Sequence, residues 1–288
     1  MACFLMISGY GLSSSFEKNG LKSFWKKRFL RIWIPYLIIR IIMVVVYYVV
    51  PAKLTLHESD AYSFQSILLD ITLIKPKNPN GWYMTCILFW YLMFYLINRI
   101  SLLNKYSNVI YLLTCCLVLV FGNELWGEQA FSFYLGVSFF KIKEKTCRSG
   151  KPWHEIVISL KASVVYLIVF VSFFTLKQIL RNTIEIQCLF NFIQMMYKAA
   201  LAMLILCFGY LLVHFSNNVI VRRLSIGLYV VGMVSYELYL SHGYYLEYIR
   251  QHSTLSIIIF YSLTILLTCI VYFSAHKLNS LISRKSKV

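Results

Sequence analysis

Residues 8–20, SGYGLSSSFEKNG, and residues 21–38, LKSFWKKRFLRIWIPYLI, decide the fold class of this chain. The first stretch closes an apolar segment, the second is basic and amphipathic, and Pro35 opens another apolar segment. The composition agrees, since 59% of the residues are hydrophobic, only 14% are charged and the mean hydropathy is +0.68. Soluble domains have about 45–50% apolar and about 25% charged residues. The sequence therefore predicts an integral membrane protein.

Nine apolar segments predict an all-α fold, a polytopic bundle of transmembrane helices. Several of them approach the roughly 20 residues that a spanning helix needs. Two are short, and the second of these either is re-entrant or extends into its flanks. A weaker amphipathic stretch, SFQSILLDITLI (63–74), either lies at the membrane interface or folds back into the bundle. The nine segments run over 2–16, 33–50, 81–98, 107–121, 130–140 (the second short one), 156–176, 190–213, 226–242 and 254–276.

Lys and Arg are distributed unevenly between the two sets of loops that these segments define. Of the 28 basic residues, 19 lie in one set, six lie in the other and three lie within segments. Because basic loops remain cytoplasmic, we expect a multi-pass protein of the cell (cytoplasmic) membrane, in contact with membrane lipids, whose C-terminus is cytoplasmic. This bias accounts for most of the net charge of +17. No nucleic acid is expected as a partner, since no folded domain with a basic face is visible.

The eight Cys give no sign of a disulfide framework or of a metal site. Most of them lie in apolar segments, and no CxxC or Cys/His spacing is present. Cys in such places acts as a small apolar residue. We therefore expect neither a bound metal nor a bound cofactor.

A cluster of cations precedes the second apolar segment on the predicted cytoplasmic side. Within it, Arg28 and Arg31 are three residues apart and would share a face of a regular helix. Two guanidinium groups suit bidentate phosphate binding. The whole cluster, with Lys22, Lys26 and Lys27, also fits a plain stop-transfer signal that sets orientation. Composition alone favours this second interpretation.

Three cations lie inside apolar segments, where a charge is costly and indicates function by default. Lys161 lies near the cytoplasmic end of its segment, where snorkelling is the favoured interpretation. Arg40, in IPYLIIRIIMVVV (34–46), either serves a site within the bundle or snorkels over roughly 8 Å to the basic surface. Lys198 lies roughly 12 Å from the predicted outer end of its segment. It suits a cavity-lining position or an ion pair with a carboxylate.

The stretch SYELYLSH (235–242) ends in a histidine at the predicted outer side. Tyr239 and His242 are three residues apart and share a helical face, and Glu237 is the one carboxylate well inside a late segment. Histidine transfers protons near neutral pH. The simpler interpretation is an interfacial histidine that only hydrogen-bonds to tyrosine or lipid headgroups. Spacing alone favours this simpler interpretation.

Two further features allow both a purely structural and a functional interpretation. The sequence SGYG (8–11) interrupts the first apolar segment, and its two glycines allow close approach of another helix or of a ligand; packing is the favoured alternative. Glu124 and Glu128 are four residues apart in a short outer loop and could bind a sugar hydroxyl or a cation. Ordinary solvated acids are the favoured interpretation there.

Four motifs, in order and with matching spacing, resemble acyltransferase family 3, whose integral membrane proteins transfer acyl groups, often acetyl, to surface carbohydrates. FLMISGYGLS (4–13) is similar to the family's second helix, and GWYMTCILFWYL (81–92) is similar to the Trp-aromatic start of a middle helix. KKRFLRIWIPY (26–36) resembles its Lys-Arg…Arg-Ile…Pro-x-Tyr signature. SYELYLSH resembles its Ser-Tyr…Tyr-Leu…His motif near the end. This match implies that His242 is a catalytic candidate, which positions substrate more than it acts as the primary base.

The resemblance implies a reaction. Acyl-CoA, expected as acetyl-CoA, would bind from the cytoplasm at Arg28 and Arg31 as co-substrate. A hydroxyl of a surface or lipid-linked glycan would receive the acyl group, which is O-acetylation of a polysaccharide in a bacterial cell envelope. A buried cation would stabilise the developing oxyanion. The candidate residues for the substrate cavity are Arg40, Tyr10, Lys198, Trp82 and Tyr239.

The family's first helix carries an Arg and a His usually regarded as catalytic, and residue 1 falls after them. We therefore expect a single acyltransferase-like domain over 1–288 that lacks this helix, with the primary base on it. Nine membrane crossings and a cytoplasmic C-terminus would put Met1 on the outer side, and one more upstream helix would put the N-terminus in the cytoplasm. Alternatively, segment 130–140 does not span the membrane, which changes the number of crossings. Two other functions stay open, an exporter of polysaccharide or lipid and an inactive truncated relative.

Overall fold

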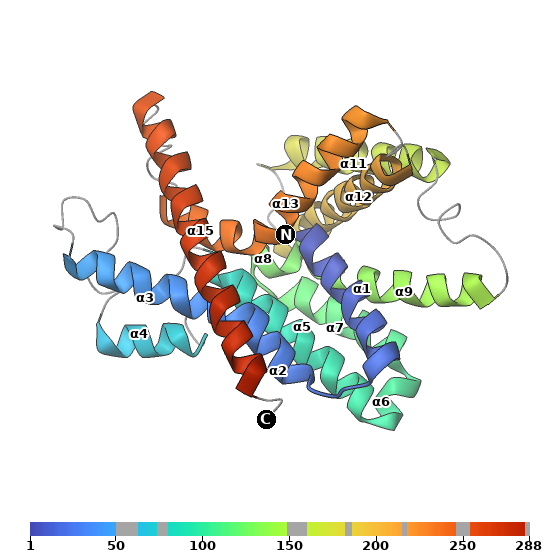
Figure 1. Cartoon of the computed structure of the whole chain (residues 1–288). Helices are drawn as coiled ribbons and strands as arrows, with labels where there is room; N and C mark the ends of the chain where they lie inside the picture. Colours follow the sequence, from blue (N-terminus) through green and yellow to red (C-terminus); the bar gives the residue numbers. More distant parts are fainter. Residues whose placement is uncertain are drawn as a thin grey trace. The chain divides into compact units, whose positions relative to one another are not determined.

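The part of the chain that the computed structural model describes consists of helices joined by short turns (Figure 1), and no strand occurs there. Six helices of this part are long and apolar enough to cross a membrane. The predicted all-α polytopic fold is therefore confirmed, while nine crossings and a cytoplasmic C-terminus stay predictions. The structure describes residues 1–49, 63–73, 80–148, 160–181, 186–214, 218–245 and 254–285.

Six of the predicted segments coincide with these long helices, and the other three lie in shorter or more polar ones. The segment predicted at 130–140 continues as one helix to Arg148, so it extends into its C-terminal flank. The helices are α1 (Ala2–Asn19), α2 (Phe24–Arg28), the π-helix η1 (Phe29–Trp33), α3 (Ile34–Val49), α4 (Phe64–Ile71), α5 (Gly81–Arg99), α6 (Ser101–Lys105), α7 (Ser107–Phe121), α8 (Glu124–Gly127), α9 (Ser132–Arg148), α11 (Leu160–Leu180), α12 (Gln187–His214), α13 (Val219–His242), the 3₁₀ turn η4 (Gly243–Tyr245) and α15 (Thr254–Lys285).

The chain divides into two compact units. Unit 1 consists of Met1–Lys22 and Phe89–Ser225, and unit 2 consists of Ser23–Leu88 and Ile226–Val288. One boundary falls between α1 and α2, and the other two fall within α5 and within α13, so each of these last two helices contributes residues to both units.

In unit 1, α1 packs along α9 and α11 packs along α12. Two glycines make the first contact close: a Cβ on Gly9 would overlap the carbonyl oxygen of Phe133, and one on Gly136 would overlap that of Met6. Small residues allow such backbone approach between apolar helices. The glycines of 8–11 therefore serve packing at Gly9, and they do not interrupt the helix, because α1 is continuous.

In unit 2, α2, η1 and α3 form one continuous span over Phe24–Val46, on which α15 packs. The π-helix lies directly before Pro35. The proline ring would clash with the carbonyl group four residues earlier in a regular helix. The wider π winding accommodates the ring, so the span continues through the proline instead of starting at it.

Large apolar side chains are exposed along several of the long helices. Ile220 and Tyr229 of α13 and Ile179 of α11 are 78%, 68% and 68% exposed. Soluble proteins rarely leave such extended apolar surface open to water. These surfaces match helices that meet lipid.

Candidate functional site

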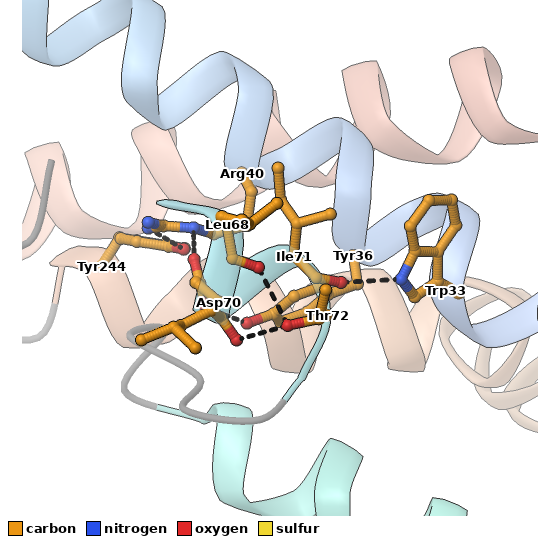
Figure 2. Close-up of polar contacts among 9 residues, drawn as sticks. Trp33, Tyr36, Arg40, Leu68, Asp70, Ile71, Thr72 and Tyr244 are labelled. Carbon is orange, nitrogen blue, oxygen red and sulfur yellow. Dashed lines mark hydrogen bonds and ion pairs between the residues drawn. The ribbon is translucent and has the colours of Figure 1, made fainter. Parts of the chain in front are cut away.

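A buried ion pair joins α3 to α4 within unit 2 (Figure 2). Arg40 is 2% exposed, and its Nε pairs with a carboxylate oxygen of the fully buried Asp70. The other oxygen of Asp70 accepts a 2.5 Å hydrogen bond from the Tyr36 hydroxyl. Nη1 of Arg40 donates to the hydroxyl of Tyr244 in η4 at 3.3 Å. These four side chains, hereafter the Arg40 network, balance one positive and one negative charge in apolar surroundings.

Asp70 reaches this network because α4 folds back onto the start of α3. Ser63 caps α4, since its Oγ accepts a hydrogen bond from the backbone N–H of Ser66 at 3.3 Å. At the other end, Nε1 of Trp33 donates to the carbonyl oxygen of Ile71 at 2.9 Å, which satisfies a group that a helix end leaves open. The stretch 63–74 therefore folds back into the bundle where it is described, which is the second of its two predicted placements.

The pairing changes the interpretation of Arg40. Its head group is not at a surface, so the snorkelling alternative is wrong. Because Asp70 compensates its charge, Arg40 is also poorly suited to stabilise a developing oxyanion. Its contacts instead fix α4 and η4 against α3.

His242 is held at the end of α13 by its own helix and by Asn80. Its Nδ1 lies 3.2 Å from the carbonyl oxygen of Leu238 and 3.5 Å from Nδ2 of Asn80. Asn80 also donates to the carbonyl oxygen of Tyr239 at 2.6 Å. The rings of Tyr239 and His242 lie 5.5 Å apart, as their spacing predicts. In the tautomer whose Nδ1–H donates to Leu238, Nε2 carries a lone pair that can accept a proton.

The aromatic residues that begin α5 extend this group. Tyr83 is 3% exposed, and its ring meets that of Tyr239 edge-on at 5.4 Å. Trp82, which the sequence singled out, is half-buried and contacts Tyr83 at 6.0 Å. Among the described residues, the buried hydroxyl of Tyr239 has no hydrogen-bond partner. Tyr83 was missed from sequence because nothing distinguishes it from its many aromatic neighbours.

Arg28 and Arg31 have different surroundings. Arg28 is half-buried, with its guanidinium carbon 5.6 Å from the centre of the Phe24 ring, whereas Arg31 is exposed within η1. Each residue of a π-helix turns the chain less than in an α-helix. Arg28 and Arg31 would share a face in a regular α-helix. In the π-helix, Arg31 is rotated away from that face. Glu237 of α13 is 9% exposed and interacts electrostatically with Arg31.

Unit 1 contains a second polar group where α8 contacts α12. Nε2 of Gln194 donates to Glu124 at 2.8 Å, and one turn further along Lys198 pairs with Glu128. Glu128 is 6% exposed and also accepts a 3.2 Å hydrogen bond from Gln129. The interpretation of Glu128 as a solvated acid is therefore wrong. Lys198 forms an ion pair, which is one of its two predicted roles.

Aromatic rings lie beside this polar group, hereafter the α8–α12 cluster. The hydroxyl of Tyr197 donates to Oε1 of Gln194 at 3.5 Å, and its ring centre lies 5.9 Å from Nζ of Lys198. Phe174 meets the Tyr197 ring edge-on at 5.8 Å. Oε1 of Gln129 is buried without a hydrogen-bond partner among the described residues. The cluster thus offers donors, acceptors and an aromatic face together.

Tyr10, the remaining cavity candidate, contacts α9. Its hydroxyl accepts a 3.1 Å hydrogen bond from Nζ of Lys143, and its ring meets Phe140 edge-on at 5.7 Å. These contacts belong to the packing of α1 on α9. In the described ranges, no group of three or more His, Cys, Asp or Glu could hold a metal ion.

Long apolar helices that enclose balanced polar clusters define a polytopic helical membrane protein. The chain belongs to acyltransferase family 3, because a family model described as "Acyltransferase domain" matches residues 1–276. It is therefore a membrane acyltransferase. No curated protein and no solved structure matches the chain.

Proposed function

We propose that this acyltransferase moves an acyl group, most simply acetyl, from cytoplasmic acyl-CoA to a hydroxyl of a surface or lipid-linked glycan. Membership of the family over residues 1–276 is the observation that carries the reaction class. In the transfer, the hydroxyl oxygen bonds to the thioester carbonyl carbon and the C–S bond breaks. The hydroxyl proton ends on the released CoA sulfur, so atoms and charge balance.

Arg28 and Arg31 bind the phosphates of the donor in this proposal. The exposed Arg31 makes the first contact, and Arg28, packed on Phe24, provides a more rigid second guanidinium group. Arginine suits phosphate because its planar fork donates two parallel hydrogen bonds. The predicted cytoplasmic location of this cluster is the side on which acyl-CoA occurs.

His242 orients the acceptor hydroxyl through Nε2, while Asn80 holds the end of α13 in place. The buried hydroxyl of Tyr239, which has no hydrogen-bond partner among the described residues, is a second group that can bind substrate beside the imidazole.

The test measures binding and hydrolysis of radiolabelled acetyl-CoA by the purified protein in nanodiscs. Each guanidinium–phosphate contact contributes about 1.5–3 kcal/mol. Arg28→Gln and Arg31→Gln should each weaken binding by roughly 10- to 100-fold. Lys26→Gln and Lys27→Gln are matched controls, because they remove the same charge from the same exposed cluster, and they should stay within about twofold.

Equal weakening in all four variants would show a diffuse electrostatic effect and would contradict a specific phosphate site. Wild-type affinity in both arginine variants would remove the donor site from the proposal. Movement of a labelled lipid-linked glycan across reconstituted vesicles, without any release of CoA, would favour the exporter instead.

A further inference from the structure

A pocket lies within unit 1 where the C-terminal half of α1 meets α5, α7 and α9. Its volume is about 220 Å³, far more than the roughly 10–15 Å³ that one water molecule requires. One wall is apolar and includes Phe94, Ile97, Val137 and Phe140. The proposed donor and acceptor groups do not line it.

The other wall carries a lysine that neutral groups hold in place. Nζ of Lys141 donates to Oγ of Ser107 at 3.0 Å and to Oδ1 of Asn108 at 2.7 Å. An ammonium group has three donors, so one N–H remains for a ligand. Partial burial lowers the pKa of Lys141, and no described carboxylate forms an ion pair with it.

The buried hydroxyl of Tyr111 is a second group in the pocket that a ligand can satisfy. Tyr111 lines the pocket, is 1% exposed and has no hydrogen-bond partner for its hydroxyl among the described residues. A buried hydroxyl that lacks a partner destabilises the protein. An acceptor atom of a bound ligand would remove that destabilisation.

The remaining charges of the pocket favour a particular head group. Glu17 and Glu144 line it together with Lys141, so a ligand that carries only negative charge is opposed. A ligand with both a phosphate and a primary ammonium group complements Lys141 and Glu17. Leu102 and Ile100, beside the pocket-lining Asn104, are 64% and 45% exposed and suit contact with acyl chains.

We propose that this pocket binds the head group of a phospholipid of the phosphatidylethanolamine type. The phosphate accepts hydrogen bonds from Lys141 and Tyr111, the ammonium group lies toward Glu17, and the acyl chains continue along Phe94, Val137 and the exposed residues of α6. This site is independent of the proposed acyl transfer.

Native mass spectrometry of the whole protein, titrated with lipids of identical acyl chains, tests the site. We expect phosphatidylethanolamine to bind at least about fivefold more tightly than phosphatidylcholine or phosphatidylglycerol. Lys141→Gln should abolish that high-affinity adduct. Lys145→Gln, an exposed lysine one turn away that does not line the pocket, should leave it unchanged.

Two further variants separate the contributions. Glu17→Gln should remove the preference for the primary ammonium group, and Tyr111→Phe should weaken binding of all three lipids about equally. Monodisperse elution of every variant shows that a loss is not unfolding. Equal adducts in Lys141→Gln and Lys145→Gln, or no lipid preference in the wild type, would overturn the proposal. Equally tight binding of free phosphoethanolamine would overturn the part assigned to the acyl chains.

Discussion

Asp70→Asn tests whether the Arg40 network is a compensated charge pair. The substitution keeps the shape of the side chain but removes the charge that balances Arg40, which is only 2% exposed. Removing one partner of a buried pair costs about 3–5 kcal/mol, because the other charge is left uncompensated. The bond from Tyr36 also loses its charged acceptor. We therefore expect the free energy of unfolding to fall by about 3–5 kcal/mol, or roughly two to three and a half orders of magnitude in the equilibrium constant.

The assay is reversible unfolding of the purified protein in mixed micelles, followed by tryptophan fluorescence. Lys27→Gln is the control, because it removes an exposed charge and should change the free energy by no more than about 0.5 kcal/mol. The double variant Arg40→Met/Asp70→Leu removes both charges and should recover most of the stability that Asp70→Asn loses. The single variants Arg40→Met and Asp70→Leu complete the comparison. If the double variant loses as much stability as these two single variants lose together, the residues are not coupled and the reasoning is refuted.

Three further predictions concern unit 1. Gly136→Leu should destabilise the contact of α1 with α9 by at least about 1–3 kcal/mol, seen as a lower thermal midpoint; an unchanged midpoint would contradict the close approach. Glu128→Gln should also destabilise the protein, but by less than Asp70→Asn, because Lys198 is 24% exposed and water compensates part of its charge; an equal or larger loss would argue against this screening. Lys141 has a lowered pKa in the folded protein, so the unfolded state binds more protons between that pKa and the ordinary value. Wild-type stability relative to Lys141→Gln should therefore rise with pH through this window in denaturation at several pH values, and a falling difference would contradict the sign.

The cation of the Arg40 network could be predicted from sequence, but its partner could not. Arg40 is conspicuous because it is an ionisable residue within an apolar run, where a charge is costly. Asp70 lies 30 residues later in a short amphipathic stretch whose placement the hydrophobic pattern left open. The available signal for the pairing was that Asp70 is a carboxylate among apolar residues, while Arg40 is a cation without an evident partner in its own segment. Only the fold-back of α4, fixed by Trp33, brings the two together.

The α8–α12 cluster was missed for a similar reason. Glu124 and Glu128 are four residues apart, and so are Gln194 and Lys198, so each pair follows one helical turn. Because both spacings are equal, Gln194 meets Glu124 and Lys198 meets Glu128 where α8 contacts α12. A four-residue helix is too short to show an amphipathic period, and acids in a short loop are ordinarily solvated. The long helices could be predicted because a spanning segment needs about 20 apolar residues.

The two buried ion pairs follow one principle, which links the fold to the proposed chemistry. In each, a long apolar helix supplies the cation, and the carboxylate lies on or directly after a short helix that packs against it. The short helix makes a buried charge tolerable in the long one. In unit 2 the arrangement reaches further, because Arg40 also donates to Tyr244, two residues after His242. The carboxylate on α4 thereby helps to fix the turn that follows the candidate substrate-positioning histidine. Asp70→Asn protein that remains folded should therefore bind the acyl donor as the wild type does but transfer acyl groups more slowly. This effect does not require residue 70 to touch either substrate.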